Sequence, residues 1–303
     1  MSPTGDVGDP GDLGDDELRS LDSLVDEALS AGEEERLPTL GYGEISLVLG
    51  WPAESPRFAC KRMPAFPSRA AFESYRRTLD DYVDVLGAAG IAVVATEMRG
   101  VEGGDGSVAG YVVQPILDAG TLAPAILHGT DPGEGHPRVA AIVAAAAATV
   151  SPRVGLDAQL SNWAWADGRL SYLDVSTPML WDDGGRSLLD LEPLAQAYPA
   201  VLRPPLRRFV APRILDGYRD LRGVYLDLCG NLLKERLDRW LDAFLGEIDG
   251  RLPDPLTSAD VHGYYRSDAR LWAVLLRLRR LDRAWRLRTG RTYPFLLPGP
   301  IER

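Results

Sequence analysis

Residues 155–174 read GLDAQLSNWAWADGRLSYLD, and they give the clearest indication of the fold that we expect for the chain. Asp157 and Asn162 lie five positions apart in a largely polar run, and Asp174 follows twelve positions after Asn162. Between them, alternating apolar residues surround the turn 166–168, a pattern that predicts two short strands joined as a hairpin. The stretch therefore predicts a loop that carries Asp157 and Asn162, followed by a hairpin that ends at Asp174.

The side chains of this stretch are those that phosphoryl transfer from ATP requires. A carboxylate such as Asp157 can orient or deprotonate an attacking hydroxyl. Asn162 and Asp174 supply oxygen atoms, which Mg²⁺ prefers as ligands when it is bound to phosphates. A cation must also hold the phosphates that are not transferred, and Lys61 can do so. The residues thus favour an ATP- and Mg²⁺-dependent enzyme.

The region 37–117 has the pattern of a small antiparallel sheet that carries one helix. Three apolar runs come first, then a helix that begins at Ser68, then two more runs. The first two runs meet at a turn with Gly41 and Gly43, and the third run holds Lys61. The strands are expected within LGYGEISLVLGW (40–51, two strands), RFACKRMP (57–64), IAVVATEMRGV (91–101) and AGYVVQPIL (109–117).

The region 118–303 has a mostly helical pattern apart from the hairpin. From about Leu188 to Arg288, apolar residues recur at helical spacing, and prolines separate the segments. We therefore expect an α+β protein, in which a five-stranded antiparallel sheet with one helix precedes a larger helical part.

The net charge of −11 is concentrated in residues 1–36, which hold twelve acidic residues and two arginines. The rest of the chain is close to neutral, so the acidity says nothing about a substrate, and nucleic-acid binding is not indicated. Glycines alternate with aspartates in the first fifteen or so residues, which are expected to be disordered. A short helix is predicted at 15–31, where leucines and a valine recur at helical spacing.

Composition excludes several classes of protein. Apolar residues make up 45% of the chain and charged residues 25%, as in folded globular proteins. No apolar run reaches the roughly 18 residues of a membrane span, and the N-terminus lacks the pattern of a signal peptide. The two cysteines and three histidines lack the spacing of a disulfide framework or a zinc site. We expect a cytoplasmic protein without a membrane partner.

Two rare residue types coincide with the predicted site. The chain uses arginine for nearly all its positive charge, and its only lysines are Lys61 and Lys234. Its only asparagines are Asn162 and Asn231. A lysine supplies a compact ammonium that the broad guanidinium of arginine does not replace, so its retention at position 61 supports a role there.

A basic cluster from Arg277 to Arg291 lies on a predicted C-terminal helix. A solvated helix face beside an apolar one is the simplest interpretation. Alternatively, the basic cluster binds a phosphate, a peptide or the acidic N-terminal segment.

Taken in order, these motifs resemble the protein-kinase-like superfamily, and especially its aminoglycoside-phosphotransferase-like branch of small-molecule kinases. The resemblance runs over about residues 37–180. The segments that carry it are Gly41-Tyr42-Gly43-Glu44-Ile45-Ser46 (glycine-rich loop), Phe58-Ala59-Cys60-Lys61 (strand with the ATP lysine), Tyr111-Val112-Val113-Gln114-Pro115 (strand before the hinge), Gly155-Leu156-Asp157 to Asn162 (catalytic loop) and Leu173-Asp174 (metal-binding segment).

The resemblance implies a bilobal fold, with an N-lobe at 37–117 that binds ATP and a helical C-lobe at 118–303. It implies that Asp157 orients the acceptor hydroxyl, that Asn162 and Asp174 hold Mg²⁺, and that Lys61 holds the α- and β-phosphates. It also implies that Gly41 and Gly43 cover the phosphates and that the backbone beside Gln114 binds adenine. Finally, it implies that Glu73 pairs with Lys61, with Asp80 and Asp81 as alternatives.

Two departures from the family pattern leave the activity open. Gly155 stands where a histidine is common, and Val175-Ser176 replaces the Phe-Gly of protein kinases. One hypothesis is a phosphotransferase acting on a hydroxyl of a small polar metabolite or antibiotic, or of a peptide, held between the catalytic loop and the C-terminal helices. The other is an inactive pseudokinase that binds a nucleotide or a partner protein.

Overall fold

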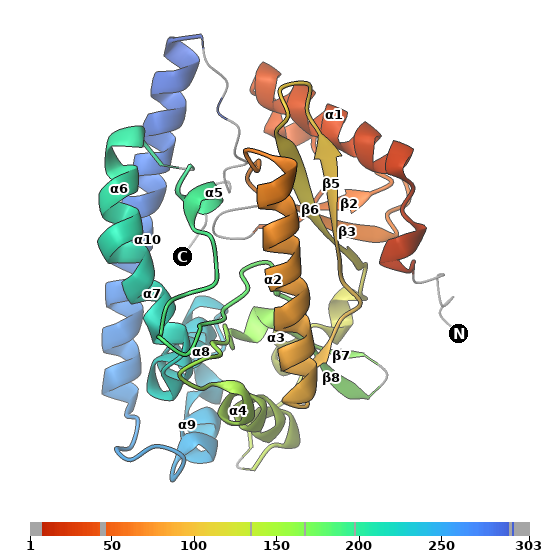
Figure 1. Ribbon diagram of the computed structural model, residues 1–303. Helices are drawn as coiled ribbons and strands as arrows, with labels where there is room; N and C mark the ends of the chain where they lie inside the picture. The colour runs from red at the N-terminus through yellow and green to blue at the C-terminus, as the bar shows by residue number, and fades with distance from the viewer. Residues whose placement is uncertain are drawn as a thin grey trace.

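The computed structural model describes residues 8–42, 47–133, 135–166, 168–196, 198–290 and 293. The protein is an α+β structure in which a five-stranded antiparallel sheet lies beside a larger group of helices (Figure 1). The fold class predicted from the sequence is therefore confirmed at this level.

The five-stranded sheet has the order β1-β2-β3-β6-β5, and every neighbouring pair is antiparallel. Its strands are β1 (Thr39–Tyr42), β2 (Leu47–Trp51), β3 (Phe58–Arg62), β5 (Glu97–Glu102) and β6 (Val108–Pro115). Lys61 on β3 lies between Val48 of β2 and Val112 of β6. The central position of β3 fixes the Lys61 backbone from both sides.

The segment 91–101, predicted as one strand, contributes strands to two different sheets. Its first part, β4 (Ala92–Val93), pairs in parallel with β8 (Arg169–Tyr172), and only its second part is β5. Together β4, β8 and β7 (Trp163–Ala166) form a three-stranded sheet. The prediction of a single strand was wrong because an apolar run does not reveal where its pairing partner changes. The predicted hairpin, β7 and β8, is confirmed.

Helix α2 (Arg69–Ala88) covers one face of the large sheet. Ser68 caps it by accepting a hydrogen bond from the Ala71 amide at 3.2 Å. Its buried residues recur three and four positions apart, which places them on one stripe of the helix. They are Phe72, Tyr75, Leu79, Tyr82 and Leu86.

Helix α1 (Asp15–Ala31) covers the opposite face, so the large sheet lies between two helices (Figure 1). Its buried leucines and valine pack against alternate residues of the sheet, including Phe58 and Tyr111. The Tyr111 hydroxyl also donates to the Asp22 carboxylate at 2.7 Å. The predicted helix at 15–31 is confirmed, and it is an integral layer of the fold.

The expectation of disorder in the first fifteen or so residues is wrong for residues 8–14. Leu13 is buried in the cluster beneath α1, and its carbonyl accepts a hydrogen bond from Arg99 at 2.9 Å. Asp9 caps a short 3₁₀ turn, Pro10–Asp12. The Gly/Asp composition did not reveal that one leucine anchors this segment to the sheet. Residues 1–7 lie outside the described part of the chain.

The chain after β6 supplies the remaining helices. Their bounds are α3 (Ala123–His128), α4 (Pro137–Thr149), α5 (Glu192–Ala195), α6 (Arg203–Pro205), α7 (Ala211–Tyr218), α8 (Leu221–Lys234), α9 (Leu241–Ile248) and α10 (Ser258–Arg288). Helix α8 packs against α4, α7, α9 and α10 and forms the centre of this group. None of the described helices combines the length and apolarity that crossing a bilayer requires.

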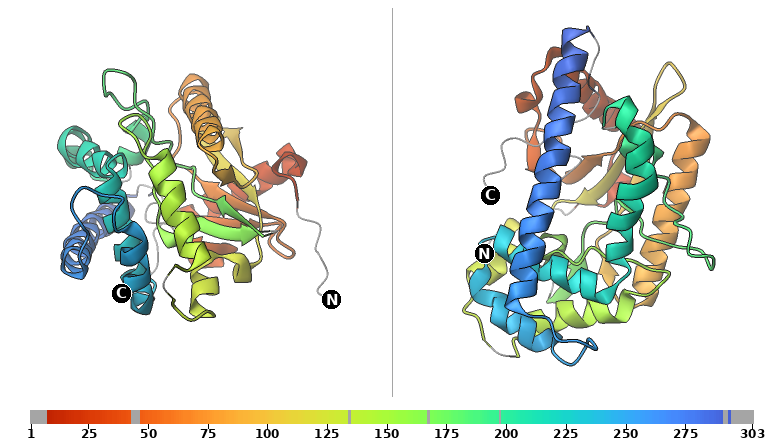
Figure 2. Two further views of the ribbon diagram at one scale, coloured as in Figure 1. Left: turned by 90° about the horizontal axis from the view of Figure 1, so that it is seen from below. Right: turned by 90° about the vertical axis from the view of Figure 1, so that its left-hand side faces the viewer.

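Helix α10 spans 31 residues, or about 46 Å at 1.5 Å per residue. It starts against α8 and runs along most of the height of the molecule (Figure 2). Near its end, both oxygens of Glu34, just before β1, accept hydrogen bonds from Arg283 at 2.6 and 2.7 Å.

The basic cluster on α10 is divided between the interior and the surface. Arg279 is buried, Arg283 pairs with Glu34, and Arg286 pairs with Asp282 at 2.8 Å. Arg277 and Arg280 are exposed. The interpretation of the whole cluster as one solvated face is therefore wrong, and its contact with the acidic N-terminal segment is made through Glu34.

Candidate functional site

A cavity of about 630 Å³ lies between the large sheet and the helices. Lys61, Asp157, Asn162 and Asp174 all line it. The sheet contributes one wall, and α5, α7 and α10 contribute another. Four residues predicted from three separate motifs thus line one cavity.

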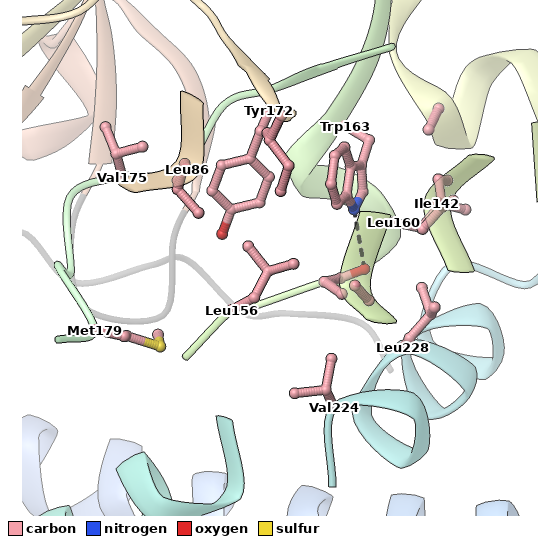
Figure 3. Close-up of a cluster of buried hydrophobic side chains, with 14 of the residues drawn as sticks. Leu86, Ile142, Leu156, Leu160, Trp163, Tyr172, Val175, Met179, Val224 and Leu228 are labelled. Carbon is pink, nitrogen blue, oxygen red and sulfur yellow. Dashed lines mark hydrogen bonds between the residues drawn. The ribbon is translucent and has the colours of Figure 1, made fainter. Parts of the chain in front are cut away.

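The loop before β7 presents its polar residues to this cavity through a strict alternation. Leu156, Ala158 and Leu160 are buried in the core, whereas Asp157 and Gln159 line the cavity. Figure 3 shows Leu156 and Leu160 among the side chains of Trp163, Tyr172 and Leu228. The indole nitrogen of Trp163 donates to the Ala158 carbonyl at 3.1 Å. The apolar side chains therefore hold the loop in place.

Three side chains bind the backbone carbonyls around Asp157. The Tyr82 hydroxyl of α2 donates to the Gly155 carbonyl at 2.9 Å. The Asp157 carbonyl accepts hydrogen bonds from the Tyr172 hydroxyl at 3.0 Å and from the Asn162 side-chain amide at 3.1 Å. These contacts fix the backbone from which the Asp157 carboxylate projects.

Gly155, at the position where the family commonly has a histidine, is closely surrounded. A Cβ atom there would lie 3.0 Å from Met179 and from Trp181, and 3.1 Å from the carbonyl of Tyr218. A histidine does not fit this backbone position without displacing its neighbours. The loop is supported by tyrosines and by residues of α8 in its place.

The support from α8 involves Asp227 and Asn231, which the motif comparison did not identify. The side-chain oxygen of Asn231 accepts from the Leu160 amide at 2.8 Å. The Asp227 carboxylate accepts from Gln159 at 2.9 Å and from the hydroxyl of Tyr264 on α10 at 2.8 Å. Burial raises the pKa of Asp227 to about 6, although its two hydrogen bonds oppose that rise. The sequence signal for these two residues was a pair of polar side chains four positions apart on an otherwise apolar helix, one of them a rare asparagine.

Lys61 and Asp174 form an ion pair across the cavity. The Lys61 ammonium donates to both carboxylate oxygens of Asp174, at 2.9 and 3.0 Å. The hydroxyl and amide of Ser176 donate to the same carboxylate at 2.7 and 3.1 Å. Burial acts to raise the pKa of Asp174, but Lys61 and Ser176 outweigh it, so the pKa is lowered. The carboxylate is thereby kept ionised.

The donor atoms around Asp174 fit a cation that is also bound by phosphates. Asn162 is adjacent to the Asp174 segment, because its carbonyl accepts from the Leu173 amide at 2.9 Å. Within the described residues, no group of three His, Cys, Asp or Glu side chains could hold a metal alone. Mg²⁺ on a nucleotide needs only one or two protein oxygens in addition to phosphates and water. Asp174 and Asn162 could supply those one or two oxygens.

Two further predicted nucleotide contacts line the cavity. The Gln114 side chain donates to the Leu173 carbonyl at 2.7 Å and to Thr96 at 2.9 Å, so it connects the sheet to the Asp174 segment. Gly41 on β1 also lines the cavity, and a Cβ atom there would meet no neighbour within 4 Å. Gly43 lies outside the described residues.

The predicted pairing of Lys61 with a carboxylate of α2 is wrong. Glu73 forms ion pairs with Arg69 at 2.9 Å and with Arg76 at 2.7 Å, both on its own helix. The alternatives Asp80 and Asp81 are exposed. The face of α2 that approaches the site carries tyrosines, and the Tyr75 hydroxyl donates to the Ser176 carbonyl at 2.8 Å. Asp174 takes the partner role that was assigned to Glu73.

Comparison with known proteins places the chain in a family without assigning an activity. A family model described as a family of unknown function (DUF6206) matches residues 20–283. This match covers most of the chain, so the protein belongs to that family. No curated protein matches the sequence significantly.

Proposed function

We propose that this member of the DUF6206 family is an ATP- and Mg²⁺-dependent phosphotransferase with a bilobal, protein-kinase-like fold. The observation that carries the proposal is the convergence of Lys61, Asp157, Asn162 and Asp174 on one cavity between sheet and helices. The four residues come from two regions of the chain that are about 100 positions apart. Phosphoryl transfer requires a cation, metal ligands and an orienting carboxylate within one cleft.

Each of these residues has a defined task in the proposed reaction. Lys61, on the central strand β3, neutralises the phosphates that remain on the donor. Asp174 and Asn162 would hold Mg²⁺, which supplies positive charge to the phosphate oxygens. Asp157 accepts the proton of the acceptor hydroxyl and orients that hydroxyl for attack. The Lys61–Asp174 ion pair holds the ammonium next to the carboxylate in the absence of ligand.

Gly155 was the main argument for an inactive pseudokinase, and its surroundings weaken that argument. The loop has support from Tyr82, Tyr172 and Asn231 that does not involve a histidine. A missing histidine therefore does not imply a collapsed or misplaced Asp157. The enzyme is the function that these contacts favour.

The decisive experiment compares Asp157→Asn with Asp174→Asn. Asp157→Asn should still bind Mg-ATP, whereas ATP turnover should fall by roughly 10²–10⁴-fold because the orienting carboxylate is lost. Asp174→Asn should also lose most of the Mg²⁺ dependence of ATP binding, because a charged ligand is removed. Isothermal titration calorimetry with and without Mg²⁺ measures binding, and release of labelled phosphate measures turnover.

Asp183→Asn is the matched control, because Asp183 is exposed and pairs with Arg153 outside the cavity. It should behave like the wild type in both measurements. If the wild type binds Mg-ATP without turnover, and Asp157→Asn behaves identically, the pseudokinase replaces the enzyme. Failure of the wild type to bind ATP at all would reject the phosphotransferase and the nucleotide-binding pseudokinase, and would leave only a pseudokinase that binds a partner protein.

A further inference from the structure

The helical wall of the cavity lies outside all the motifs that suggested phosphoryl transfer. It is formed by α5, the π-helical segment Leu206–Val210, the following helix α7, and α10. Its side chains are predominantly apolar, and several are only partly buried because they face the cavity. Prominent among them are Leu194, Leu206, Val210, Ile214, Leu215 and Trp272.

From this wall we infer that the acceptor is an alcohol with an extended apolar body, alkyl or aryl. The inference rests on the proposed phosphotransferase function, because it assigns the acceptor side of the same cavity. The Asp157 carboxylate would meet the hydroxyl, and the apolar body would lie against α5, α7 and α10. This assignment differs from the small polar metabolite, antibiotic or peptide that the resemblance implied.

The charges around the cavity oppose a polycationic acceptor. Among its described lining residues, the only carboxylates are those of Asp157 and Asp174. Asp174 is already paired with Lys61. The helical side contributes two cations, Lys234 and Arg207, the latter paired with Glu192. A substrate carrying several ammonium groups would meet only these two carboxylates, one of them paired with Lys61 and the other needed for catalysis.

The apolar wall also has a quantitative consequence for binding. Removing one CH₂ group from water strengthens binding by a factor of about four. A polar acceptor of equal size would leave the leucines, Ile214 and Trp272 beside a hydrophilic surface and gain nothing from them. A series of alcohols that differ only in chain length therefore distinguishes the two kinds of acceptor.

The test measures binding of 1-butanol, 1-hexanol and 1-octanol by titration calorimetry, with kanamycin as the polycationic probe. Each step of two CH₂ groups should tighten binding about sixteenfold, and kanamycin should show no binding. Ile214→Gln and Trp272→Ala should weaken 1-octanol binding about tenfold or more, because each removes apolar surface from the wall.

Val274→Ala is the matched control, because Val274 lies on the same helix as Trp272 but is exposed and does not line the cavity. Its affinity for 1-octanol should equal that of the wild type. Affinity without chain-length dependence, binding of kanamycin, or an equal loss in Val274→Ala would overturn the inference. Chain-length-dependent binding in a protein that never turns over ATP would instead reject the phosphotransferase and leave an apolar ligand site.

Discussion

Asp227 holds a carboxyl group in the interior, directly beneath the loop that carries Asp157. Its two hydrogen-bond donors, Gln159 and Tyr264, come from the loop and from α10. Burial disfavours the ionised form, and the neighbouring Asp268 adds to that effect, so the pKa is raised to about 6. The group that holds the loop carrying Asp157 therefore titrates near pH 6.

The stability of the wild type should fall as the pH rises toward about 6. Between an ordinary pKa of 3.8 and the folded-state value of about 6, the folded protein holds a proton that the unfolded chain has released. The loss is bounded by about 3 kcal/mol, at about 1.4 kcal/mol per unit. Urea unfolding at pH 4.5, 5.5 and 7 measures this change. As the pH rises, the free energy of unfolding of Asp227→Asn should increase relative to that of the wild type. A difference between the two proteins that does not change with pH would contradict the assignment.

The chemistry of the side chains allowed the prediction that Lys61, Asp157, Asn162 and Asp174 share one site, and all four line one cavity. Asp227 could not be predicted, because its role depends on α8 packing beneath a loop almost seventy positions earlier in the chain. Glu73 was misassigned for a local reason. It lies one position after Phe72 and outside the buried stripe of α2, and only the orientation of that helix shows that the stripe carries tyrosines toward the site.

Among the elements, α1 shows that the bounds of a helix can be predicted where its packing cannot. Its apolar spacing predicted the bounds 15–31 correctly. Its role could not be predicted, because sequence periodicity does not identify the surface against which an apolar stripe packs. The acidic composition suggested a tail, whereas the structure has a layer that covers β3 and β6.

Replacement of a central leucine of α1 should destabilise the whole sheet. Leu21 is fully buried, so Leu21→Ala should lower the free energy of unfolding by about 2–5 kcal/mol. Leu24→Ala, on the same helix and only partly buried, should have a clearly smaller effect. Chemical denaturation followed by circular dichroism measures both. Equal, small losses in the two variants would mean that α1 is only loosely attached to the sheet.

At the scale of the whole molecule, α10 connects the two walls of the cavity. Its middle contributes Trp272 and Leu275 to the cavity, and its end binds Glu34 beside the sheet. This pair joins residues 249 positions apart. The family motifs end near residue 180 and gave no indication of it, but binding of the acidic N-terminal segment was one of the alternatives that the sequence offered for the basic cluster.

Removal of this long-range pair should have a modest effect that depends on salt. Arg283 and Glu34 are partly exposed, so Arg283→Gln should lower the free energy of unfolding by at most about 1 kcal/mol. The double exchange Glu34→Arg with Arg283→Glu should recover part of the loss. Urea unfolding in 0.05 M and 1 M salt measures the effect, which should be smaller in 1 M salt because ions screen the pair. An effect equal at both salt concentrations would indicate lost packing instead.

The position of α10 in the chain also determines the order in which the protein can be completed during translation. The ribosome releases the N-terminal segments first, so α1 and the large sheet can assemble while later residues are still being added. The wall formed by α10 becomes available only after about residue 275 has emerged. Until then the leucines of α5 and α7 that line the cavity remain without their last neighbour. A nascent chain can therefore form its sheet before α10 can close the cavity.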